Sequence, residues 1–176
     1  MRGQFGQEVT GRLVSTFILS RLDYCNAIVA GLLVSTLAPL QRVVHAAARV
    51  VYDFKPYDHV TPTLKALHWL PVKHRIEFKL CLLVHLVING RAPVYMQNLF
   101  TTTASVSGRA SDRSASNNDL VKQSTRLKLG DRAFSAAGPC VWNRLPTELK
   151  AITDTCVFRR KLNNLFYFLQ QTLSSH

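Results

Sequence analysis

Apolar side chains recur every third or fourth position through much of the N-terminal half, and this spacing predicts amphipathic helices. The first helix is expected from about residue 10 to residue 31, with an apolar stripe of Val14, Phe17, Ile18, Leu22 and Cys25. Because Cys25 lies on this stripe, we expect its thiol to be buried and unreactive. The charged residues beside it, Arg21 and Asp23, fall off the stripe, and Asp23 and Tyr24 are expected to fix helix contacts.

A second helix is expected to begin with Ser35 as its N-cap residue, with Pro39 early enough to be tolerated. Its predicted core side consists of Leu40, Val43, Val44, Ala47 and Val51. At roughly 100° per residue, the opposite side carries Arg42, His45 and Arg49. This edge is positively charged and has no acidic residue.

Two further helices are predicted between residues 61 and 90. Thr61 and Pro62 are typical of a helix start, and Leu70–Pro71 separates this helix from the next. The longer helix ends at Asn89–Gly90, and its predicted core side is Ile76, Leu80, Leu83 and Val87. A short helix from about Val94 to Phe100 is expected to complete an N-terminal helical bundle, residues 1–100.

The composition changes at residue 101. The stretch TTTASVSGRASDRSASNND is small and polar, and it predicts a mobile linker over residues 101–119 that carries Arg109 and Arg113. Beyond it, RLKLG alternates and RAFSAAGPCVW follows a Gly130–Asp131 turn, which predicts a short β-hairpin-like segment with a sharp bend at Gly138–Pro139.

The chain is predicted to close with two helices. LPTELKAI indicates a short one, and an amphipathic helix capped by Asp154 or Thr155 carries Phe158, Leu162, Leu165 and Leu169 at helical spacing. The expected fold class is therefore mainly α, with a small α+β C-terminal part over residues 120–176.

The charge balance of the chain indicates which class of partner it binds. Lys and Arg total 22 against 10 acidic residues, which gives a net charge of +12 and a pI near 10.1. Such a balance favours a polyanionic partner, nucleic acid first and an acidic membrane surface second, although a generally basic solvated surface would give the same composition. The candidate binding residues are Arg42, Arg49, Lys73, Arg75, Lys79, Lys122, Arg126, Lys128, Arg132, Arg159, Arg160 and Lys161.

Candidate catalytic chemistry is sparse. The three glutamates and seven aspartates are scattered, and the chain has neither a glycine-rich phosphate loop nor a GxSxG motif. His74, Cys81 and His85 share one helix side, but His74 lies about 10.5 Å along the axis from Cys81, so we expect packing there and no metal. We expect no enzyme, no cofactor and no small-molecule substrate.

The compartment is expected to be intracellular, cytoplasmic or nuclear. The four cysteines form no CxxC pair, and the first apolar run lacks a convincing signal-peptide cleavage site. The longest apolar run, LCLLVHLVI, is too short to span a bilayer, so no membrane partner is expected.

Several blocks of the sequence resemble one protein family. SRLDYCNAIVAGL, LAPLQRVVHAAARVVYDF, HVTPTLKALHWLPVKHRIEFKLCLLVH, NGRAPVYMQNLF and GDRAFSAAGPCVWNRLPTELK occur in this order. They resemble the region after the reverse transcriptase core of non-LTR (LINE-type) retrotransposon polyproteins, as in chicken-repeat-like and jockey-like elements. The resemblance extends from about Glu8 to Phe168, but Leu33 stands where relatives usually have proline.

The resemblance implies a thumb and a C-terminal extension that grip RNA or a template–primer duplex. It implies no catalytic residue, because the chain contains no Asp-Asp pair. The expected function is therefore a non-catalytic, nucleic-acid-binding fragment of an RNA-directed DNA polymerase. Two alternatives stay open: a functionless translated relic of a mobile element, and a protein-interaction module that uses apolar faces around Phe78 and Phe166.

Overall fold

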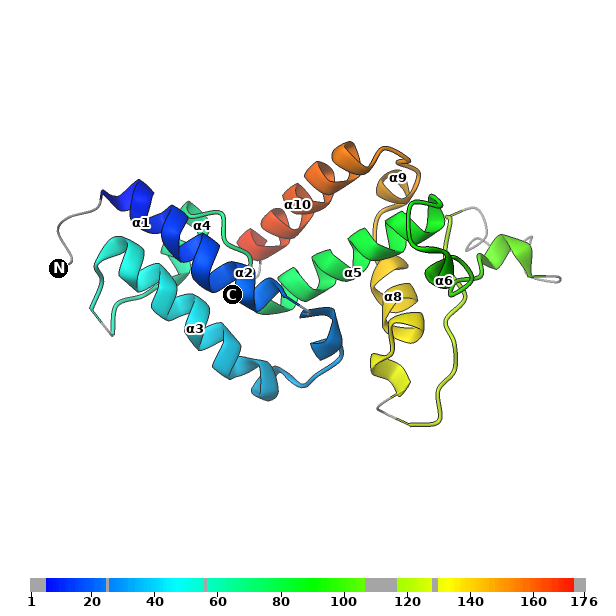
Figure 1. Ribbon diagram of the computed structural model, residues 1–176, viewed down its shortest axis with the longest axis horizontal. Helices are drawn as coiled ribbons and strands as arrows, with labels where there is room; N and C mark the ends of the chain where they lie inside the picture. The colour runs from blue at the N-terminus through cyan, green and yellow to red at the C-terminus, as the bar shows by residue number, and fades with distance from the viewer. Residues whose placement is uncertain (1–5, 25, 56, 107–116, 128–129, 173–176) are drawn as a thin grey trace. The chain divides into compact units, whose positions relative to one another are not determined.

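The computed structural model of the protein describes residues 6–24, 26–55, 57–106, 117–127 and 130–172, and these residues form helices joined by turns (Figure 1). No strand occurs in these ranges, where an isolated antiparallel bridge pairs Thr102 with Leu120. The mainly α prediction is confirmed. Among the described helices, none is long and apolar enough to cross a membrane.

The chain divides into two compact units. Unit 1 comprises Met1–Asn26, Leu32–Arg75 and Phe166–His176, and unit 2 comprises Ala27–Gly31 and Ile76–Leu165. The helices α5 (Val72–Ile88) and α10 (Thr155–Thr172) contribute residues to both units. The predicted division at residues 100 and 119 stays a prediction, since residues 107–116 of its linker lie outside the described ranges.

Unit 1 begins with a helical segment whose winding changes along its length. It consists of α1 (Gln7–Val14), a π-helical turn (Ser15–Leu19) and α2 (Ser20–Asp23). A π turn adds a residue to the repeat and shifts the faces that follow it. The prediction of Phe17 as a core residue is therefore wrong: Phe17 is 69% exposed, whereas Leu19 is buried. Cys25 lies outside the described residues.

The longest helix of unit 1 is α3 (Val34–Tyr52), which packs against α1 and α4 (Thr61–Ala66) (Figure 1). Its N-cap residue is Leu33 and not Ser35, and no side chain caps this end. Its buried residues are Leu37, Val44, Ala47, Ala48 and Val51, while the predicted core residue Val43 is 42% exposed. The buried stripe therefore includes Ala48 in place of Val43.

Helix α5 begins after Pro71 and ends before Asn89–Gly90, as predicted. Gly90 adopts a φ of +66°, and Arg91 N–H donates to the Leu86 carbonyl at 2.8 Å, which closes the helix end. Within unit 2 a wide side of α5 is buried, since Leu80, Cys81, Val84 and His85 are each at most 1% exposed. Lys79 and Ile88 are exposed, so α5 also keeps a solvent-facing side, as an amphipathic helix does.

The predicted β-hairpin-like segment is wrong. Residues 134–142 form helix α8 (Phe134–Trp142), which is preceded by a 3₁₀ turn (Gly130–Arg132), and Gly138–Pro139 lies inside the helix. A Cβ at Gly138 would lie 3.0 Å from Val84 and from Phe100, so the glycine permits a close approach. Tertiary contact favours the helix here against the local preference of the Gly–Pro pair.

The extended chain around Leu120 forms the isolated bridge with Thr102 and also pairs with a side chain that follows α8. Asn143 Oδ1 accepts from Leu120 N–H, and Asn143 Nδ2 donates to the Leu120 carbonyl, both at 2.9 Å. Trp142 Nε1 donates to the Asn118 carbonyl at 3.0 Å. These bonds satisfy the backbone groups that a second strand would otherwise have occupied.

The remaining helices of unit 2 are short, apart from α10. Among the residues that the structure describes, they are α6 (Val94–Gln97), α9 (Thr147–Lys150) and the 3₁₀ turns Asn26–Val29, whose Asn26 belongs to unit 1, and Thr103–Ser105. The predicted cap of α10 is confirmed, because Asp154 Oδ1 accepts from Val157 N–H at 2.7 Å. Phe158 and Leu162 are fully buried on its inner side.

Candidate nucleic-acid interface

Three exposed cations of unit 2 follow one another on the first half of α10. Arg159, Arg160 and Lys161 are exposed and stand between Phe158 and Leu162, which are both 0% exposed. The two buried residues fix the orientation of this half, since positions four apart share one helix side. The three cations therefore have to point away from the core.

Two features extend this basic surface. Asn163 and Asn164 follow on α10 and are exposed, so amide groups stand next to the cations. At the start of the helix, Arg91 Nη1 donates to Thr155 Oγ1 at 2.6 Å, and Arg159 lies one turn beyond Thr155. Arg91 was not among the predicted binding residues. Only its contact with α10 brings it to this surface, and no sequence signal marks it.

Of the two arginines on the predicted basic edge of α3, one is exposed. Arg42 is exposed, whereas Arg49 is half-buried, with Nη2 at 3.4 Å from the Asp58 carbonyl. Its Nε is buried and has no hydrogen-bond partner among the described residues. His45 shares a 2.8 Å hydrogen bond with Gln41, and burial and then the charge of Arg49 lower its pKa, so it adds no charge near neutral pH.

The cations of α5 differ in role. Lys73 in unit 1 and Lys79 in unit 2 are exposed. Arg75 instead serves the fold of unit 1: its Nη1 lies 2.8 Å from Asp23 Oδ2, and its Nε donates to the Leu70 carbonyl at 2.8 Å. Its side chain is only 14% exposed, which leaves little of the guanidinium for a ligand. The helix contact expected of Asp23 is this ion pair.

The cations between residues 122 and 132 lie in unit 2. Lys122 and Arg126 are exposed, while Lys128 lies outside the described residues. Arg132 is half-buried, and its Cγ would lie 3.3 Å from a Cβ added at Gly31. The side chain of Arg132 is therefore packed close to Gly31. Among the described residues of this segment, Lys122 and Arg126 are the exposed candidates.

Most acidic residues of the described ranges are engaged within their own unit. Glu8 pairs with Arg12, Asp23 pairs with Arg75, and Lys150 Nζ lies 2.5 Å from Asp119 Oδ1. Asp58, Asp131 and Asp154 accept hydrogen bonds from backbone or hydroxyl groups. The excess positive charge is therefore carried by exposed lysines and arginines that face solvent.

The side of α5 that carries His74, Cys81 and His85 is packed. His74 in unit 1 lies against Phe166, with ring centroids 5.4 Å apart, and His85 in unit 2 stacks on Phe158 at 4.1 Å. Burial and then the charge of Glu77 raise the pKa of Cys81, so its thiol stays protonated. Among the described residues, no group of three potential ligands could hold a metal ion.

The comparisons with known proteins add no identification: no protein-family model, no curated protein and no solved structure matches the chain.

Proposed function

We propose that the chain binds nucleic acid without catalysing a reaction, as a segment from the region after the catalytic core of a non-LTR retrotransposon reverse transcriptase. The sequence blocks that resemble this region support the origin, and the basic surface of α10 supports the binding. A nucleic-acid partner would place the protein inside the cell, in the cytoplasm or the nucleus. Because the chain has no Asp-Asp pair, we expect no dNTP incorporation with template, primer and divalent metal.

The observation that carries the proposal is the arrangement of Arg159, Arg160 and Lys161. They are exposed, they follow one another on a helix that contains no acidic residue, and the buried Phe158 and Leu162 fix their direction. Phosphate groups are neutralised by cations spread in this way, and the release of counterions supplies the affinity. Asn163 and Asn164 add hydrogen-bonding groups for sugars and bases.

A salt titration of oligonucleotide binding tests the proposal. Replacing Arg159, Arg160 and Lys161 with Ala should flatten the log–log salt slope by about 2 for a single strand, if each cation neutralises one phosphate. The fold should change little, because exposed substitutions usually alter the free energy of unfolding by less than about 0.5 kcal/mol. The matched control is Arg144→Ala, which removes an exposed cation of the same unit that lies outside α10.

An unchanged slope in the triple variant would exclude the surface of α10 as the interface. Arg42→Ala tests the α3 edge separately, and it is preferable to any change at Arg49, which has structural contacts. Absence of salt-dependent binding by the unmodified protein would overturn the proposed function as a whole.

One observation favours a second candidate function, a protein-interaction module. Val9, Leu13 and Phe17 are 46%, 42% and 69% exposed along α1 and the π turn, an apolar surface in unit 1. The face first expected to serve this role does not do so around Phe166, which is 4% exposed and packs on His74. A monodisperse protein complex that lacks nucleic acid, and that Phe17→Ser abolishes, would support this candidate.

A further inference from the structure

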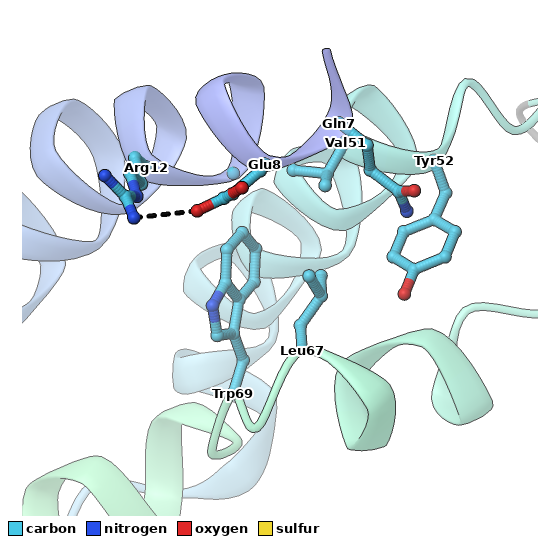
Figure 2. A pocket seen from close by; sticks show the side chains of 8 residues that line it. Gln7, Glu8, Arg12, Val51, Tyr52, Leu67 and Trp69 are labelled. Carbon is cyan, nitrogen blue, oxygen red and sulfur yellow. Dashed lines mark hydrogen bonds and ion pairs between the residues drawn. The ribbon is translucent and has the colours of Figure 1, made fainter.

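Unit 1 contains a groove of about 400 Å³ that the proposed function does not use. Its apolar part consists of Val51, Tyr52, Leu67 and Trp69, which come from the end of α3 and the chain after α4. Figure 2 shows Tyr52 and Trp69 at the two ends of this surface, with Leu67 between them. Gln7, Glu8 and Arg12 on α1 line the remaining side.

The local structure holds Trp69 in place. His68 adopts a φ of +54°, which turns the chain after α4, and Trp69 N–H donates to the Leu64 carbonyl at 2.9 Å. Gln170 Nε2 lies 3.4 Å from the Trp69 carbonyl. The indole therefore belongs to a fixed wall and not to a free loop.

Gly11 leaves the groove open. It lines the groove on α1, and a Cβ added there would meet only Val51 Cγ1, at 3.7 Å, an ordinary contact. The missing side chain keeps space between α1 and the aromatic residues. A longer side chain at this position would enter the groove.

The polar groups favour a neutral ligand. Arg12 Nη2 lies 2.7 Å from Glu8 Oε1, so the two opposite charges offset each other, and the carboxylate disfavours a phosphate group. Both side chains are more than three-quarters exposed and can turn toward a ligand. With the Gln7 amide, they offer the donors and acceptors that match the edge of a heterocyclic base.

From this combination we infer that the groove binds an unpaired nucleobase of a single strand. The inference rests on the proposed function for the strand itself, whose phosphates would be held by exposed cations. Single-stranded bases are recognised by aromatic side chains that stack on their faces and polar groups that pair with their edges. The volume lies within the range of about 300–1,000 Å³ that small-ligand sites occupy.

Fluorine NMR of the full chain labelled with fluorotryptophan tests the inference. The sequence contains two tryptophans: Trp69, which lines the groove and is 8% exposed, and Trp142, which is 1% exposed in unit 2 and serves as an internal reference. We expect adenosine and a short oligoadenylate to shift the Trp69 signal. Ribose phosphate and an abasic oligomer, which carry phosphate without a base, should leave it unchanged.

Two variant pairs connect the shift to the groove. Tyr52→Leu should weaken adenosine binding about tenfold through lost stacking, while Tyr57→Leu, at a 97% exposed position of the same unit, should leave it unchanged. Gly11→Leu should abolish the shift by filling the groove, and Gly11→Ala, which adds only an ordinary contact, should retain it. The second pair removes no aromatic packing, so it stays informative if Tyr52→Leu fails to fold.

The outcomes separate this inference from the proposed function. Oligonucleotide binding detected by fluorescence anisotropy, with no Trp69 shift from adenosine or the oligomer, would overturn the base site and leave the function intact. A Trp69 shift with adenosine, but no binding of the oligomer, would overturn both the proposed function and the assignment of the groove to a single strand, because the groove would then be a site for a free nucleoside. A Trp69 shift on raising the protein concentration alone would show that a second copy occupies the groove, which also overturns the inference.

Discussion

Tyr167 Oη donates a hydrogen bond to the Lys65 carbonyl at 2.9 Å, although the two residues are 102 positions apart in the sequence. The Tyr167 ring also lies 4.9 Å from the His68 ring. The C-terminal end of α10 thus holds the end of α4 and the left-handed residue that precedes Trp69, within unit 1.

We expect Tyr167→Phe to lower the free energy of unfolding by about 1 kcal/mol, because the variant keeps the ring contact and loses one hydrogen bond. Urea denaturation measures this difference. Tyr57→Phe, at a 97% exposed position, is the matched control and should have no effect. Equal stability of the two variants would show that the Lys65 contact contributes nothing.

The two helical glycines of α1 and α8 should respond to alanine with opposite signs. Gly11→Ala should stabilise the protein by about 0.5–1 kcal/mol, since alanine is the better helix former and its Cβ meets only an ordinary contact. Gly138→Ala should destabilise it by about 1–3 kcal/mol, because its Cβ would lie 3.0 Å from Val84 and Phe100. Thermal unfolding of both variants checks the signs, and a stabilising Gly138→Ala would contradict the close packing of α8.

The ion pair of Lys150 with Asp119 should contribute more to stability than a surface pair. The Lys150 side chain is 3% exposed, and its Nζ also donates to the Asn143 carbonyl at 3.1 Å. Lys150→Met should therefore lower the free energy of unfolding by about 3 kcal/mol, since it leaves the Asp119 charge unpaired in a low-dielectric setting. The exposed Lys161→Met is the control, with an expected change within about 0.5 kcal/mol. Similar losses from both variants would exclude a special role for the buried pair.

Stability should fall on acidification, in part because of His85. Burial lowers the pKa of His85 from its ordinary value of 6.5, the charge of Arg91 lowers it further, and Asp154 acts in the opposite direction. Above pH 6.5 the imidazole is neutral in both states, so its contribution is complete there. Below that pH the unfolded chain binds a proton that the folded chain resists, and stability is lost.

Denaturant unfolding from about pH 7.5 to about pH 5.5 checks this dependence. His85→Phe should reduce the acid sensitivity by up to about 1.4 kcal/mol per pH unit while it keeps an aromatic ring against Phe158. Some sensitivity should remain, because the pKa of His45 is lowered as well. His59→Gln changes an exposed histidine and is the matched control. If both variants follow the same pH profile as the unmodified protein, His85 is not a source of the acid sensitivity.

Local signals in the sequence correctly predicted the helix ends that depend on interactions between neighbouring residues. The break at Leu70–Pro71, the stop at Gly90 and the cap at Asp154 depend on groups within a few residues of one another, so the sequence identifies them directly. The excess of positive charge is equally a property of composition.

Tertiary contacts decided the features for which distant residues compete. Phe134–Trp142 is helical because Gly138 lets α8 approach Val84 and Phe100, a fact that no nearby residue reveals. Because of the π turn, Leu19 is buried and the predicted core residue Phe17 is exposed. One added residue in a turn changes which of the later side chains face the core.

The same reason separates the cations. Arg75 is committed to Asp23 by an ion pair across 52 positions, Arg91 reaches Thr155 across 64, and Arg159 points outward because Phe158 is buried beside it. The sequence determines that these positive charges exist and on which helices they lie. Only the packing of side chains from remote segments determines which of them remain exposed for a polyanion, because burial and pairing depend on neighbours that the local sequence does not specify.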